Sequence, residues 1–183
     1  LLSTKTGGNC ALDPSNARYT CTGYYTRKFS HYKSGRSGNL DGYFKEFRLA
    51  ELYLNYAEAA NEASTTGTVP NDAVNAVRSR VGMPGIPYGL SCDQFRLRIR
   101  NERRVELAFE EHRFFDVRRW KMLDQTDKVI TGMKANSDGS YSRFVVDNNR
   151  KAYSEKFLLY PIPGDEAIRL QNASGTNCQN PGW

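Results

Sequence analysis

Apolar residues recur at helical spacing between positions 46 and 63. Phe47, Ala50, Leu54 and Ala57 fall on one stripe of a helix. A second apolar stripe lies beside the first and consists of Leu49, Tyr53, Tyr56 and Ala60. A helix with so broad an apolar face is predicted to be buried on more than one side.

A second helix is predicted at residues 72–81, after the helix-breaking stretch STTGTVPN. Asp72 can cap its amino end, and Gly82 with Pro84 can end it. Its apolar repeat consists of Ala73, Val77 and Val81. Because the break is short, the segment 46–83 is expected to form an antiparallel helical hairpin.

Small side chains in this hairpin, including Ala57 and Ala76, are expected near the contact between its helices. They would permit close packing of the kind seen in tetratricopeptide units. One such pair cannot complete a solenoid, so other helices must cover it.

Residues 91–123 predict further helix. Ser91 and Gln94 form a capping box at its start, and a break is expected near His112. The pattern weakens after Lys121. The fold class is therefore mainly α, with helix pairs like those of tetratricopeptide proteins.

The two ends of the chain predict little regular structure. Residues 1–45 are loop-rich, and within them GYYTRKF suggests a short strand. Residues 124–183 are expected to be irregular with a short β-hairpin. In that hairpin YSRFVV is a strand after a turn at 136–140, and KFLLYPIP is a second extended run. Trp183 is expected to pack back against the body of the protein.

The composition is that of an ordinary globular domain. The chain has 183 residues, of which 39% are hydrophobic and 25% charged, and this excludes wholesale disorder. No apolar run approaches the roughly 18 residues that cross a bilayer. The chain begins with Leu1, so we expect a mature piece of a protein. Most of the net charge of +6 lies in residues 1–45.

The cysteines do not predict a metal site. Cys10, Cys21, Cys92 and Cys178 form no CxxC pair, and two histidines are too few to complete a zinc site easily. We therefore expect no metal and no cofactor. A disulfide between Cys10 and Cys21 and a set of free buried thiols remain alternatives.

Glu102 and Glu106 fall within the apolar stripe of the helix that follows Ser91. Buried carboxylates without partners would cost several kcal/mol, so a structural ion network with nearby arginines is predicted. Its other members are Arg103, Arg113, Arg118 and Arg119. Helical spacing also allows the local pairs Arg103–Glu106, Glu110–Arg113 and Asp116–Arg119.

Two functional interpretations of this helix are alternatives to the structural one. A nucleic-acid-binding face would be basic along one side, whereas here acids share the stripe, so we expect no nucleic-acid partner. Glu102 and Glu106 with His112 could perform acid–base catalysis, for example in a glycan-processing enzyme. The chain carries no G-x-S-x-G elbow, phosphate loop or H-E-x-x-H helix.

Five segments in order resemble the C-terminal part of the SusD/RagB family of nutrient-binding lipoproteins. They are FRLAELYLNYAEAANE, AVNAVRSRVGMP, IRNERRVELAFEEHRFFDVRRW, LLYPIP and QNPGW. With GYYTRKF, the resemblance covers about residues 23–183.

The resemblance implies a surface-binding role without catalysis. It implies that the protein is held at the outer membrane of a Gram-negative bacterium by a lipid on an N-terminal portion that this chain lacks. There it would bind oligosaccharides or other polymeric nutrients and deliver them to a SusC-like TonB-dependent transporter. An intracellular helical scaffold that binds nucleic acid or protein is a further alternative.

No ligand-binding motif carries over from the family, so the candidates come from residue chemistry. A tyrosine ring can stack on a sugar, while Arg, Asn and Asp can hydrogen-bond its hydroxyls. Tyr32, Arg36, Asn39 and Asp41 combine these functions in one Gly/Ser-rich loop. Tyr24 is a further candidate, although packing of its ring against the helices is the alternative.

Overall fold

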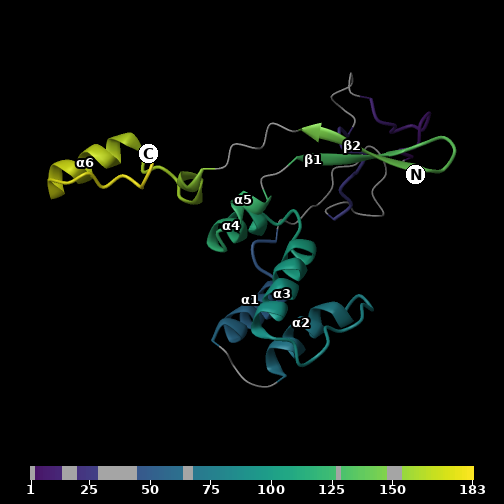
Figure 1. Ribbon diagram of the computed structural model, residues 1–183, viewed down its shortest axis with the longest axis horizontal. Helices are drawn as coiled ribbons and strands as arrows, with labels where there is room; N and C mark the ends of the chain where they lie inside the picture. The colour runs from purple at the N-terminus through teal and green to yellow at the C-terminus, as the bar shows by residue number, and fades with distance from the viewer. Residues whose placement is uncertain (1–2, 14–19, 29–44, 64–67, 127–128, 148–153) are drawn as a thin grey trace. The chain divides into compact units, whose positions relative to one another are not determined.

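The computed structural model describes residues 3–13, 20–28, 45–63, 68–126, 129–147 and 154–183 (Figure 1). The chain divides into two compact units, which are described separately. One is Lys33–Asp116, and the other combines Leu1–Tyr32 with Val117–Trp183. The described residues contain six α-helices and one two-stranded sheet, which confirms the mainly α class. No helix in these ranges is long and apolar enough to span a bilayer.

The helical unit Lys33–Asp116 is built on α1 (Leu49–Glu62), α2 (Val69–Ser79) and α3 (Cys92–Glu106). Helix α1 packs against both α2 and α3 (Figure 1). The predicted contact between the first two helices is therefore confirmed. Their shared core consists of Leu54, Ala57, Ala73, Val74, Val77, Ile86, Phe95, Ile99 and Leu107.

Two details predicted for the helical hairpin are wrong. Helix α2 is capped at Thr68 and not at Asp72, because Pro70 fits the first turn of a helix, where its missing N–H is not needed. Asp72 instead accepts hydrogen bonds from Thr68 Oγ1 (2.9 Å) and the Tyr88 hydroxyl (2.8 Å). Ala76 is exposed, since Ala73 and Val77 turn the opposite face of α2 inward.

Helix α1 buries one side in the described residues, not the two that its pattern predicted. Leu54 and Ala57 are fully buried, whereas Leu49 is 63% exposed and Tyr56 is 50% exposed. Leu52 and Tyr53 continue the exposed stripe. Periodicity identifies faces that are apolar, and it does not say which of them finds a partner.

Helix α3 begins with the predicted capping box. Ser91 Oγ accepts from the Gln94 backbone N–H, and the Gln94 side chain accepts from the Ser91 N–H. The predicted break near His112 is also present. Phe109 and Glu111 have φ of 63° and 65°, which no α-helix allows, and α4 (His112–Arg119) begins directly afterwards.

The second unit contains a β-hairpin of β1 (Ile130–Ala135) and β2 (Tyr141–Asp147). The strand predicted at YSRFVV is confirmed, but its partner is β1. The KFLLYPIP run instead contains the 3₁₀ turn η1 (Glu155–Leu158). GYYTRKF is not a strand, since residues 24–27 have no regular structure.

The chain near its amino end lies along this hairpin. Thr6 N–H donates to Ala135 O (3.0 Å), and Met133 N–H donates to Thr22 O (2.8 Å). The crossing is close enough that a Cβ on Gly23 would lie 1.9 Å from Met133 O. Glycine is therefore required at the point where the segment meets β1.

The same unit has two further helices, α5 (Leu123–Thr126) before the hairpin and α6 (Gly164–Ser174) after it. Helix α6 corrects the prediction that residues 124–183 are irregular apart from a hairpin. Beyond it the chain returns to η1, where Trp183 Nε1 donates to Lys156 O (3.0 Å) and Leu159 O (3.2 Å). The return of Trp183 onto earlier chain is thus confirmed within this unit.

Candidate functional site

Four of the predicted ligand-binding residues, Tyr32, Arg36, Asn39 and Asp41, lie outside the described residues. Tyr24 is described, and its ring is 62% exposed. Its backbone N–H donates to Thr22 Oγ1 at 3.4 Å, next to the crossing of the hairpin. Tyr24 therefore stays a candidate platform for a sugar.

Glu102 is buried on α3 and is paired with an arginine of α2. Arg78 Nη1 donates to Glu102 Oε2 at 2.5 Å, and Arg78 Nε donates to Pro84 O. Glu102 also borders a small hollow of about 110 Å³ between α3 and the loop around Ile86. Its charge is thus compensated from another helix, by an arginine that periodicity on α3 alone could not identify.

Glu106 and Glu110 share Arg48, the residue before α1. Arg48 Nη1 donates to Glu106 Oε1 and Arg48 Nε to Glu110 Oε2, both at 2.6 Å. Arg80 Nη2 adds a second bond to Glu106 at 2.9 Å. Burial lowers the pKa of Arg48, but the hydrogen bonds and charges of Glu110 and Glu106 outweigh it and raise the pKa above its usual value.

Arg103 is the buried centre of the network. Its Nε and Nη2 donate to the two carboxylate oxygens of Asp116 at 2.9 and 3.1 Å, and its Nη1 donates to Asn55 at 2.5 Å. Glu58 lies 3.8 Å from Arg103 Nε. A planar guanidinium suits this two-pronged pairing, which joins α1, α3 and α4.

The other predicted network arginines differ from one another in their surroundings. Arg113 is half-buried, and burial together with the nearby charge of Arg104 lowers its pKa, while Asp116 opposes the shift. The Arg118 guanidinium lies 5.8 Å from the centre of the Tyr160 ring. That of Arg119 lies 5.1 Å from the centre of the Trp120 ring.

These contacts leave the carboxylates of α3 poorly placed for acid–base chemistry. A general acid or base must reach substrate with its own oxygen, whereas Glu102 and Glu106 direct oxygens at guanidinium groups. His112 Nε2 lies 3.5 Å from Glu51 of α1. Glu102, Glu106 and Glu110 form ion pairs with arginines outside α3 and α4, which helical spacing did not suggest.

The described residues contain no cluster of His, Cys, Asp and Glu that could hold a metal ion. Cys10, Cys21, Cys92 and Cys178 are free thiols in the structure, and Cys21 and Cys92 are exposed. Cys10 and Cys21 therefore form no bridge in the structure, and none of the four thiols is fully buried.

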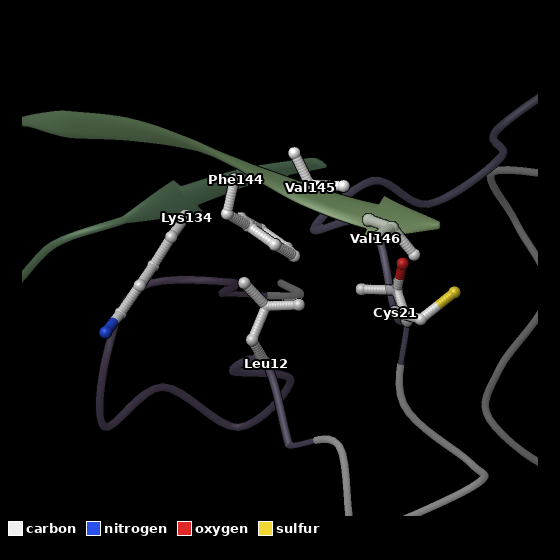
Figure 2. Close-up of a pocket in the computed structure, with 7 residues that line it drawn as sticks. Leu12, Cys21, Lys134, Phe144, Val145 and Val146 are labelled. Atoms are coloured by element: carbon white, nitrogen blue, oxygen red, sulfur yellow. The ribbon is translucent and has the colours of Figure 1, made fainter. Parts of the chain in front are cut away.

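A larger cavity, of about 470 Å³, lies between the amino-terminal segment and one face of the hairpin (Figure 2). Its walls are formed by Leu12, Thr20, Cys21, Lys134, Phe144, Val145 and Val146. Phe144 and Val146 share a strand face with Lys134, since Lys134 pairs with Ser142 and alternate residues point the same way. No pattern in the sequence indicates this cavity, because the local pattern does not predict β1.

A family model, two relatives and a solved structure that match this chain are all SusD-like. The model of the SusD family matches residues 4–183. SusD-like protein P2 of Formosa agariphila is 32% identical over 137 residues, which cover 71% of this chain and 24% of that protein. SusD-like protein P25 of the same organism is 34% identical over 123 residues, with 66% and 21% covered.

A solved structure agrees with these relatives. The crystal structure of a SusD-like protein from Bacteroides fragilis superposes with a TM-score of 0.79 and 34% sequence identity. The superposition covers 93% of this chain and 32% of that one, so the chain spans between a fifth and a third of the length of these relatives. The match over residues 4–183, supported by likeness in both sequence and fold, shows that the chain belongs to the SusD family.

Proposed function

We propose that this chain is the C-terminal portion of a longer protein that binds oligosaccharides or other polymeric nutrients at the cell surface. Family membership over residues 4–183 is the observation that carries the proposal. The SusD family supports a general role in glycan binding during nutrient uptake. In this role the protein delivers its ligand to a SusC-like TonB-dependent transporter and is tethered to the outer membrane by a lipid outside this chain.

The protein binds its ligand without cleaving it in this proposal. Glu102 pairs with Arg78, and Glu106 pairs with Arg48 and Arg80. These ion pairs support that view, because each guanidinium stabilises the charged carboxylate and holds one of its oxygens. The glycan-processing alternative would require one of these glutamates to leave its arginine. No contact in the described residues favours the intracellular scaffold.

Tyr32, Arg36, Asn39, Asp41 and Tyr24 remain the proposed ligand contacts within this chain. A sugar exchanges hydrogen bonds with water for hydrogen bonds with protein, so each polar contact contributes little net free energy. The ring of Tyr32 should therefore matter more than any single polar group.

The test is the binding of a glycan panel to the complete protein, measured by affinity electrophoresis and calorimetry. Tyr32→Ala should weaken binding by about two- to tenfold, if a sugar–ring contact is comparable to the about 0.5–1.5 kcal/mol of an aromatic pair. Tyr141→Ala is the matched control, because Tyr141 is 71% exposed on the hairpin. Failure of every glycan and peptide in the panel to bind would overturn the proposed function.

A further inference from the structure

The cavity beside the hairpin has the size and position of a small-molecule site. Its volume of about 470 Å³ falls within the roughly 300–1,000 Å³ of ligand sites in proteins. All of the lining residues that the structure describes belong to the unit that combines Leu1–Tyr32 with Val117–Trp183. Figure 2 shows the Phe144 ring and Leu12 facing each other across it, with Val146 and Cys21 on one side.

The lining is mainly apolar. Leu12, Phe144 and Val146 supply hydrocarbon surface, and the Thr20 hydroxyl adds one polar group. A ligand that fills this space gains mostly by removing apolar surface from water, at roughly 25 cal/mol per Å². A sugar, whose hydroxyls need hydrogen-bond partners, would find few in such a lining. The complementary group is a hydrocarbon chain or ring.

Lys134 is the single charged side chain among the described residues of the lining. Its side chain extends away from Phe144 and Val146, and the ammonium lies at its far end (Figure 2). An ammonium beside an apolar wall favours a ligand with a negative group at one end of an apolar body.

The walls of the cavity are held in position by backbone contacts. The Met133 N–H bond to Thr22 O fixes the amino-terminal segment on β1 directly after Thr20 and Cys21. Gly132 permits this approach, because a Cβ there would lie 2.5 Å from the Phe144 ring and 2.8 Å from Thr22 O. A cavity with such walls needs little rearrangement on binding.

We propose that this cavity binds a medium-chain amphipathic carboxylate, with its hydrocarbon chain between Leu12, Phe144 and Val146 and its carboxylate on Lys134. The proposed site uses none of the residues proposed to contact the nutrient, and it does not rest on the proposed function.

The first test is calorimetric titration of the chain with straight-chain carboxylates from hexanoate to tetradecanoate. Affinity should rise about fourfold per added methylene, which corresponds to about 0.8 kcal/mol, until the cavity is full. It should then stay constant or fall. A rise that continues through the whole series would indicate adsorption to exposed apolar surface and would overturn the proposal.

The second test separates the charge from the hydrocarbon chain. Lys134→Met should weaken decanoate binding by about two- to fivefold, as expected for a partly exposed ion pair, and leave decanol binding unchanged. Arg169→Met is the matched control, because it removes one positive charge from an exposed position of α6. Equal effects of the two variants on decanoate would contradict the role of Lys134.

The third test fills the cavity. Val146→Trp should abolish binding of both decanoate and decanol, with circular dichroism used to verify that the hairpin unit remains folded. If this variant unfolds, two measurements still decide the proposal. They are the plateau of affinity in the carboxylate series and the comparison of Lys134→Met with its control. Undiminished binding in a folded Val146→Trp protein would place the ligand elsewhere.

Discussion

Arg103 shows why the charged residues of α3 are structural. Its side chain is 4% exposed, as buried as the aliphatic core beside it, and it has partners on α1 and α4. A buried guanidinium is tolerated because Asp116 compensates its charge and Asn55 accepts a further hydrogen bond. Removing Arg103 therefore takes from Asp116 a two-pronged ion pair inside the buried core.

Arg103→Met should therefore lower the free energy of unfolding by about 3–5 kcal/mol. Chemical denaturation monitored by circular dichroism measures the change. The control is Arg96→Met on the same helix, since Arg96 pairs with Glu62 at the surface and its loss should cost about 1 kcal/mol or less. Similar losses for the two variants would show that burial does not distinguish them.

Asp138 in the hairpin turn offers a pH-dependent test. The Ser140 hydroxyl donates to Asp138 Oδ1 at 2.7 Å and the Ser140 backbone N–H donates to the same oxygen at 2.9 Å. These bonds favour the carboxylate and lower the pKa of Asp138. The stabilisation is present above the ordinary aspartate pKa and is lost as the pH falls through the lowered value.

Ser140→Ala should raise the pKa of Asp138 towards its ordinary value. The substitution removes the hydroxyl hydrogen bond, which lowers this pKa more than the backbone N–H bond does. Carboxyl carbon shifts followed by NMR across an acid titration measure it. Ser137→Ala is the control within the same turn. An unchanged Asp138 pKa in Ser140→Ala would mean that the hydroxyl contact is absent in solution.

Among the elements, the hairpin depends on the segment that crosses it. Gly23 and Gly139 share a left-handed backbone, with φ of 81° and 86°. They differ in their surroundings, because nothing lies within 4 Å of a Cβ on Gly139 whereas Met133 O blocks a Cβ on Gly23. The two positions therefore separate backbone strain from steric exclusion.

Gly139→Ala should cost about 1–2 kcal/mol, the ordinary penalty of a side chain in this conformation. Gly23→Ala should cost a further 1–3 kcal/mol or displace the amino-terminal segment from the hairpin. Denaturation curves give the energies, and hydrogen exchange at the Met133 amide reports the displacement. Equal losses of unfolding free energy in the two variants, with unchanged hydrogen exchange at the Met133 amide, would contradict the close crossing.

The elements that periodicity predicted are those with a buried apolar face. Helices α1, α2 and α3 each bury residues such as Leu54, Val77 and Ile99, and the break before α4 follows from the end of that pattern. Helix α6 was not predicted, and it has no buried residue in the structure. Its acidic first turn and Gly175, with φ of 72° at the C-cap, were the available signals.

Strand β1 was missed for a different reason. Its sequence, ITGMKA, contains a glycine that lowers strand propensity. That glycine is there because Phe144 and Thr22 occupy the space of a side chain. The need arises from chain that is distant in sequence, which a local pattern cannot show.

At the scale of the whole molecule, the order of short motifs was enough to indicate the family, which no single residue could. The candidate site was less predictable. The network partners Arg48, Arg78 and Arg80 come from outside α3, and the cavity requires segments that are far apart in the chain. Burial of Glu102 was readable from spacing, but the identity of its arginine was not.

If the proposed binding role holds, the complete protein should release no products from glycans incubated with it, when chromatography follows the mixture over many hours. The reason is that Glu102 and Glu106 form ion pairs with arginines. Glu102→Gln and Glu106→Gln should leave this result unchanged. Sustained turnover that either substitution abolishes would replace the binding role with an enzymatic one.

The cluster around Arg103 also constrains how the sequence can diverge. Replacing either Arg103 or Asp116 alone leaves the other buried charge without its two-pronged partner, whereas joint replacement of both by apolar residues of similar volume can be nearly neutral. The ion-paired sequence and the apolar double variant are thus separated by a destabilised single variant. A lineage that changes one codon at a time would have to pass through that variant. Such a barrier keeps a buried ion pair in place for historical reasons, even where a hydrocarbon core of the same shape would be as stable.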